Sequence, residues 1–167
     1  MIPPWSYRDK MKSGDRGVEF KYSTMSDRDI INLPVNEIAA ENCWLFLWAT
    51  FPRLPLALEV INSWGFAYKT LGFNWVKTNK KQTDTLFWGC GSYTRSNSEI
   101  CLLGIKGKVK RQSATVHSQI ISPIQRHSQK PSEARDRIVK LCGDLPRIEL
   151  FAREKTPGWD CWGNEVN

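Results

Sequence analysis

Long apolar runs are missing from this sequence, and so are the residue patterns of metal sites and disulfide frameworks. No stretch approaches the roughly 20 apolar residues of a membrane helix, and the first residues lack the charged and then apolar pattern of a secretory signal. Histidine occurs only twice, and the five cysteines are scattered without a C-x-x-C spacing. We therefore expect a soluble, cytoplasmic protein with reduced cysteines, no metal and no membrane partner.

The length and the apolar content suit one compact core. With 167 residues, of which 41% are hydrophobic, the chain is long enough for one domain and too short for two large ones. It contains no internal repeat and no low-complexity linker. The sequence predicts a single domain over residues 1–167.

Short continuous apolar runs alternate with helical patterns. The runs at residues 43–49, 73–76, 100–105 and 148–152 are typical of strands buried on both faces. The helical patterns cover residues 53–64 and 132–142, and a shorter helix is expected after Ser26, ending before Pro34. This alternation predicts an α/β fold with a mostly parallel sheet and helices on both faces. Ligands of such sheets bind beyond the carboxyl ends of the strands.

The formal net charge of +7 would attract an anionic polymer. The charge is concentrated in residues 106–111, which include Lys108, Lys110 and Arg111, and Lys77, Lys80, Lys81 and Arg95 add to it. An isolated basic run is more often a solvated loop, so this feature alone does not establish nucleic-acid binding.

Three segments carry residues suited to chemistry. Pro3-Pro4-Trp5, with Tyr7 nearby, combines a rigid turn with rings that could stack on a base, although such a turn often packs its indole inward. Lys130 directly precedes a helix, where a cation and free backbone N–H groups can hold a carboxylate. Arg153, Asn164 and Glu165 follow a buried strand and offer donors and acceptors to hydroxyl groups.

Taken in order, these segments resemble the MT-A-70 family of adenine methyltransferases, and the resemblance covers nearly the whole chain. The specific parts are Pro-Pro-Trp at 3–5, YSTMS at 22–26, WLFLW at 44–48, WVKT at 75–78, EICLLGIKG at 99–107, HSQKP at 127–131, and ELFAR at 149–153 running on to Asn164.

The resemblance implies a Rossmann-like fold and S-adenosyl-L-methionine as the cofactor, with no metal. It assigns the catalytic turn to Pro3, Pro4 and Trp5. Cofactor binding falls to Lys130, for the carboxylate, and to Arg153, Asn164 and Glu165. The expected substrate-binding residues are Tyr7, Arg95, Asn97, Glu99, Lys108, Lys110 and Arg111.

One position departs from the family pattern. Members carry an aspartate before the two prolines, where it accepts a hydrogen bond from the target amine, and here Ile2 stands in its place. The strand expected before this motif is also lacking, so the sheet is expected to miss one central strand. Either the chain is shortened, which we favour, or it is a decayed homologue.

The leading functional hypothesis is methyl transfer to the exocyclic amine of adenine in DNA, which we favour over RNA as the nucleic-acid partner. The alternative is a catalytically impaired homologue that binds nucleic acid or stabilises a partner subunit. A homodimer is also compatible with the sequence, and a plain α/β domain with structural prolines and tryptophans is a weaker third interpretation.

Overall fold

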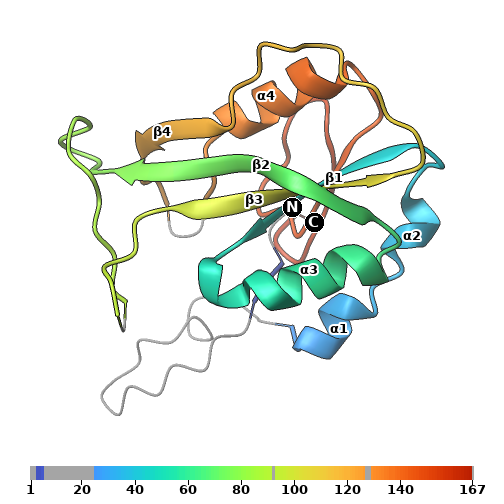
Figure 1. The fold of residues 1–167 in the computed structure, drawn as a ribbon, viewed down its shortest axis with the longest axis horizontal. Coiled ribbons are helices and arrows are strands. Elements are labelled where there is room, and N and C mark those ends of the chain that lie inside the picture. Colours follow the sequence, from blue (N-terminus) through green and yellow to red (C-terminus); the bar gives the residue numbers. More distant parts are fainter. Residues whose placement is uncertain (1–2, 6–24, 92, 127–128, 167) are drawn as a thin grey trace.

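The computed structural model describes residues 3–5, 25–91, 93–126 and 129–166. Four strands form the main sheet, in the spatial order β1-β3-β2-β4 (Figure 1). Their bounds are β1 Cys43–Ala49, β2 Ala67–Thr78, β3 Glu99–Lys106 and β4 Gln119–Pro123. A smaller sheet pairs β5 Ile148–Leu150 with β6 Asp160–Trp162 in parallel.

The main sheet is mixed, which corrects the prediction of a mostly parallel sheet. Strand β3 runs antiparallel to both of its neighbours, β1 and β2, and only β2 and β4 pair in parallel. The cause is the connection from β2 to β3, which has no helix and returns the chain beside the strand that it has just left. Burial on both faces produces the same continuous apolar run in either strand direction, so the sequence pattern could not reveal the reversal.

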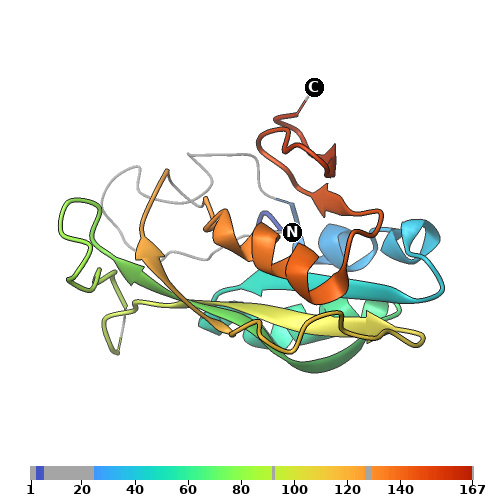
Figure 2. The same ribbon diagram turned by 90° about the horizontal axis from the view of Figure 1, so that it is seen from above.

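Helices cover both faces of this sheet, as predicted (Figure 2). Alternate side chains of β1 point to opposite faces: Leu45 and Leu47 join the cluster packed with α3 (Leu54–Ser63), whereas Phe46 and Trp48 join the cluster packed with α4 (Glu133–Cys142). The α/β, Rossmann-like fold class predicted from the sequence is therefore confirmed, with the mixed sheet as its correction.

Short helices close the α3 face. In α1 (Asp27–Ile31), the Ser26 hydroxyl accepts the backbone N–H of Asp29 at 3.1 Å, which is the predicted cap. The fully buried Trp64 indole donates to the carbonyl of Ile30 at 2.9 Å and thereby ties α1 to the end of α3. Helix α2 (Val35–Ile38) follows Pro34 and was not predicted.

The two sheets are not joined by hydrogen-bonded strands within the described residues. Strand β1 is the edge of the larger sheet, and β5 and β6 make the smaller one alone. This separation is compatible with the expected absence of one central strand, which stays a prediction. Across the described ranges, no helix combines the length and the apolar character needed to cross a membrane.

Candidate functional site

The carboxyl ends of β1, β2 and β4 meet at one edge of the main sheet. The register places Ala49 opposite Ile100, Trp75 opposite Glu99, and Thr78 opposite Pro123, so the amino end of β3 lies at the same edge. This is the edge at which open α/β sheets bind ligands.

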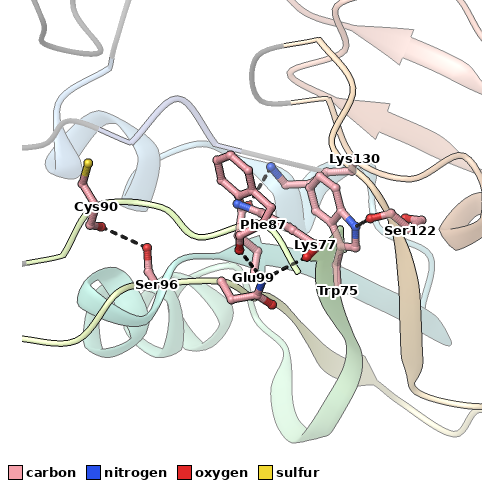
Figure 3. A network of polar contacts seen from close by, with 9 residues as sticks. Trp75, Lys77, Phe87, Cys90, Ser96, Glu99, Ser122 and Lys130 are labelled. Atoms are coloured by element: carbon pink, nitrogen blue, oxygen red, sulfur yellow. Dashed lines mark hydrogen bonds and ion pairs between the residues drawn. The ribbon is translucent and has the colours of Figure 1, made fainter. Parts of the chain in front are cut away.

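A buried carboxylate at this edge is shared by two lysines (Figure 3). Glu99 accepts from Lys77 Nζ at 2.6 Å through one oxygen and from Lys130 Nζ at 2.8 Å through the other. The side chains are only 15%, 19% and 9% exposed for Glu99, Lys77 and Lys130. Two ammonium groups on one carboxylate leave a net positive charge, which suits an anionic ligand beside them.

Burial and charge act in opposite directions on this cluster. Burial opposes ionisation of Glu99, but Lys130 and Lys77 together outweigh it and hold the pKa of Glu99 below its ordinary value. Burial lowers the pKa of Lys130, and the charge of Glu99 offsets only part of that effect. The salt bridges therefore keep ionised groups in a place that would otherwise reject them.

Lys130 is also on the wall of a cleft of about 890 Å³, open mouth included. The cleft lies between the carboxyl end of β1, helix α4 and the segment that follows β5. Its charged and aromatic lining comprises Arg126, Lys130, Arg135, Arg153, Glu149, Glu154, Glu165, Trp48, Phe151 and Trp159. Such a mixture of apolar walls and a few charged groups is typical of small-molecule sites.

Two further ion pairs stand in the cleft walls. Arg135 on α4 bonds Glu149 on β5 at 2.8 Å and holds the helix against the smaller sheet. Arg153 bonds Glu165 at 2.9 Å, and both side chains are more than two-fifths exposed. The second pair is open to solvent and can rearrange around a ligand at little cost.

The Pro3–Trp5 corner joins the cleft through Trp48. The Trp5 indole donates to the Trp48 carbonyl at 3.3 Å, and Lys130 Nζ lies 5.9 Å from the centre of the Trp48 ring. The predicted catalytic turn and the predicted cofactor lysine therefore both lie next to Trp48, the turn at its carbonyl and the lysine at its ring.

Within this corner the indole is packed inward. Trp5 is only 3% exposed and belongs to the core cluster on the α3 face. The Pro3 carbonyl accepts the Trp5 backbone N–H at 2.8 Å, and the Pro4 carbonyl accepts that of Met25 at 3.3 Å. In this arrangement the Trp5 ring does not present a free face for a base.

Three predicted substrate residues lie on or beside the loop that connects β2 and β3. Glu99 is the shared carboxylate, and Asn97 braces the loop by donating its amide to the carbonyls of Lys77, at 2.9 Å, and Phe87. Arg95 approaches the carbonyls of Gly89 and Trp88 at 3.5 Å each. Asn97 thus has a structural role, and Glu99 faces the cleft lysine.

The basic loop lies elsewhere. The backbone N–H of Lys108 donates to the Asn42 side chain at 2.6 Å, just before β1 begins, and Lys108, Lys110 and Arg111 are exposed. This is the opposite end of β3 from Glu99, a separation of roughly 23 Å at about 3.3 Å per residue. The structure does not bring these predicted substrate residues to the cleft.

The remaining predictions have mixed outcomes. Arg153 and Glu165 line the cleft, while Asn164, next to Glu165, is exposed and is not among the lining residues. Tyr7 and Ile2 lie outside the described residues. Of the residues that the structure describes, no three or more histidine, cysteine or acidic side chains gather as a metal site would require.

Sequence reasoning missed four residues of this region: Trp48, Lys77, Arg135 and Glu149. Lys77 lies at the carboxyl end of a buried apolar run, where ligands of such sheets bind. That position could have identified it as a candidate site residue. Arg135 and Glu149 come from distant elements and are paired only by the fold.

Comparison with known proteins places this geometry in a family context. The MT-A70 family model matches residues 1–165. The chain is 35% identical to the type II methyltransferase M.MunI of Mycoplasma sp over 98% of its own length and 75% of that protein. It is 29% identical to the N(6)-adenosine-methyltransferase catalytic subunit METTL3 of Homo sapiens, over 99% of its length. It covers only 27% of that human protein, and 23% of a similar MT-A70-like protein of Arabidopsis thaliana.

Proposed function

Because the chain belongs to the MT-A70 family, we propose that it transfers a methyl group from S-adenosyl-L-methionine to the exocyclic amine of adenine in DNA. The observation that carries the proposal is the contact through Trp48, which joins the Pro3–Trp5 corner to a charged cleft. When bound, the cofactor supplies an electrophilic methyl group on a sulfonium centre.

The residues of the cleft fit such a cofactor. S-adenosyl-L-methionine carries a carboxylate, an ammonium group, a ribose diol and an apolar purine. The net positive Lys77–Glu99–Lys130 cluster suits the carboxylate, and Glu165 offers an acceptor to ribose hydroxyls. Trp48 and Phe151 provide apolar walls against which a purine can pack.

Fewer groups are available to hold the adenine amine that would receive the methyl group. The exocyclic amine of adenine is a poor nucleophile because its lone pair is delocalised into the ring, so hydrogen-bond acceptors must hold it in line. Ile2 stands where relatives of this pattern have an acid, and an isoleucine cannot accept a hydrogen bond. Loss of one such partner costs about 2.7–4 kcal/mol, or roughly 10²–10³ in rate. We expect slow turnover from the chain as it stands.

Similarity to the Mycoplasma relative, a type II methyltransferase, supports DNA as the substrate, and the net charge of +7 suits either nucleic acid. All five cysteines are free, which fits the reducing, cytoplasmic setting that we propose.

Ile2 also favours a second candidate function, a nucleic-acid-binding or partner-stabilising module without turnover. A partner subunit or a second copy of the chain would be the protein that it stabilises. The two candidates differ in one measurable respect, the transfer of a methyl group.

The test is transfer of labelled methyl groups to adenine-containing DNA and RNA oligonucleotides by the parent chain, Ile2→Asp and the control Ile2→Leu. We expect Ile2→Asp to exceed the other two by roughly 10²–10³ and to prefer DNA. No transfer by Ile2→Asp, across varied sequences and with cofactor binding verified by calorimetry, would contradict the enzymatic proposal. Salt-sensitive oligonucleotide binding without transfer would then support the second candidate.

A further inference from the structure

The loop between β2 and β3, residues 79–98, exposes large aromatic rings. The Tyr93 side chain is 101% exposed, Trp88 is 52% exposed, and Leu86 is 42% exposed. The loop projects beyond the end of β2, away from both helical layers (Figure 1). Exposed apolar side chains grouped on one loop make that loop a candidate interaction site.

Hydrogen bonds within this loop hold its conformation. Asn79 donates to the Thr85 hydroxyl at 2.8 Å, and the Ser96 hydroxyl donates to the Cys90 carbonyl at 3.0 Å. The backbone N–H of Gly89 donates to the Ser96 carbonyl at 2.7 Å, and Asn97 ties the loop to the end of β2. Figure 3 shows the hydrogen bond from Ser96 to Cys90, together with the carboxylate of Glu99 that the two lysines share. A braced loop holds its rings in place before a ligand arrives, which lowers the entropy cost of binding.

The loop also begins and ends at the candidate site. It leaves β2 just after Lys77 and returns to β3 at Glu99, and these two residues are bonded to each other at 2.6 Å. Through Glu99 it is connected to Lys130 in the wall of the cleft. A polymer whose adenine enters this region must therefore pass close to the loop.

Charge indicates the kind of ligand. Residues 79–98 contain Lys80, Lys81 and Arg95 against the single acid Asp84, a net charge of +2. Cations interleaved with exposed rings are typical of surfaces that follow a phosphate backbone and stack on its bases.

The exposed area argues against a protein partner. A Trp or a Tyr buries at most about 150–250 Å². Two rings and a leucine therefore fall short of the roughly 800 Å² per partner that a standard protein interface needs.

We propose that the β2–β3 loop is a nucleobase-binding element, in which Trp88 and Tyr93 stack on bases next to the adenine that enters the cleft. This inference rests on the proposed function, because it takes nucleic acid as the substrate. It adds residues that neither the sequence pattern nor the cleft assigns. The phosphates alongside are bound by Lys80 and Lys81.

The test compares Trp88→Ala and Tyr93→Ala with Trp88→Phe and Tyr93→Phe, which keep a ring. Tyr68→Ala is the matched control, since Tyr68 is 47% exposed but pairs with Gly104, towards the far end of β3 from Glu99. Binding of an adenine-containing single-stranded oligonucleotide carrying 2-aminopurine is followed by anisotropy and by quenching of the 2-aminopurine fluorescence, a signature of stacking.

We expect each alanine variant to lose about fivefold to a hundredfold in affinity, together with part of the quenching. The phenylalanine variants should keep most of both, and Tyr68→Ala should match the parent. Thermal unfolding and calorimetry with S-adenosyl-L-methionine should be unchanged in all five variants, because none of these side chains belongs to the core or the cleft.

Other outcomes overturn the inference. Parent-like binding by both alanine variants would overturn it, and so would a parent chain that binds no oligonucleotide. Alanine variants that keep their affinity but change the oligomeric state in sedimentation would identify the loop as a protein interface instead.

The assay needs no methyl transfer, so the two proposals can fail separately. If binding depends on the rings but Ile2→Asp transfers no methyl group, only the enzymatic proposal is contradicted. If Ile2→Asp transfers methyl groups but the alanine variants bind as the parent does, only the role of the loop is contradicted.

Discussion

Replacing Glu99 with glutamine removes the one negative charge that two buried lysines share. The Lys77 and Lys130 ammonium groups lie 2.6 Å and 2.8 Å from its oxygens. A glutamine of the same shape leaves one oxygen acceptor and places an amide donor against the other lysine. Two cations, 19% and 9% exposed, would then face each other without a counter-charge.

The expected cost follows from that geometry. Removing one partner of a buried ion pair typically costs about 3–5 kcal/mol, because the other charge is left in low dielectric. Residual exposure and the remaining amide oxygen reduce this here, so we expect Glu99→Gln to lower the free energy of unfolding by about 2–4 kcal/mol. For a chain of this length, that corresponds to a fall in Tm of about 5–15 °C.

The measurement is urea and thermal unfolding of the parent, Glu99→Gln and the control Glu133→Gln. Glu133 forms an exposed pair with Arg137 at 2.6 Å, its side chain being 49% exposed, and its loss should cost less than about 1 kcal/mol. The pH profile gives a second reading. The pKa of Glu99 is lower in the folded chain than its ordinary value of 4.5, so its stabilisation is present above pH 4.5 and is lost as the pH falls further. In Glu99→Gln this part of the acid destabilisation should disappear.

Two results would refute this reasoning. The first is a Glu99→Gln chain as stable as the Glu133→Gln control, and the second is an acid profile that the substitution leaves unchanged. Either would mean that water or rearranged side chains already satisfy Lys77 and Lys130. A double variant, Glu99→Gln with Lys130→Met, tests which lysine causes the destabilisation. If the unpaired Lys130 causes it, adding Lys130→Met should recover part of the stability lost in Glu99→Gln.

The remaining predictions concern backbone conformation and thiol chemistry. Gly107→Ala should lower the free energy of unfolding by more than about 1 kcal/mol in urea, because φ is +64° at this position and a Cβ would lie 2.3 Å from the carbonyl oxygen of Glu41. Stability equal to that of the parent would contradict this loop conformation. Maleimide should label the exposed Cys90 fastest in the native chain, whereas Cys101 and Cys142, whose burial raises the pKa to about 12, should react only on unfolding. Cys90→Ser should remove the fastest native labelling, and rapid native labelling of Cys101 would refute its burial.

The sequence was sufficient where one local pattern determined one element. The run at residues 43–49 became β1 with the same bounds, and the pattern at 53–64 became α3 after a single 3₁₀ turn at Phe51–Arg53. The sequence did not predict strands whose side chains are exposed or only partly buried. The first third of β2, residues 67–70, is exposed, and β4 and β6 are short strands with mixed burial, so none of them produces an apolar run.

The site residues that could be predicted are mainly those that the family resemblance assigned. Lys130, Arg153 and Glu165 were expected at the cofactor and line the cleft. Lys108 and its neighbours were expected to bind the nucleic acid only because they are basic, and a charge pattern does not say at which end of a strand a loop will lie. Pairings such as Arg135 with Glu149 depend on how α4 packs against β5, and no spacing in the sequence encodes that contact.

Trp48 explains why the two halves of the candidate site depend on one strand. Its carbonyl accepts the Trp5 indole, its ring lies beneath Lys130, and its neighbours Leu47 and Ala49 pack on the opposite face of the sheet. Because β1 pairs with β3, Trp48 lies opposite Cys101, two residues from Glu99, which itself pairs with Trp75 of β2. The methyl donor and the adenine amine must approach to about 3–3.5 Å for in-line transfer. A contact point held within paired strands, such as Trp48, suits this requirement better than two separate loops would.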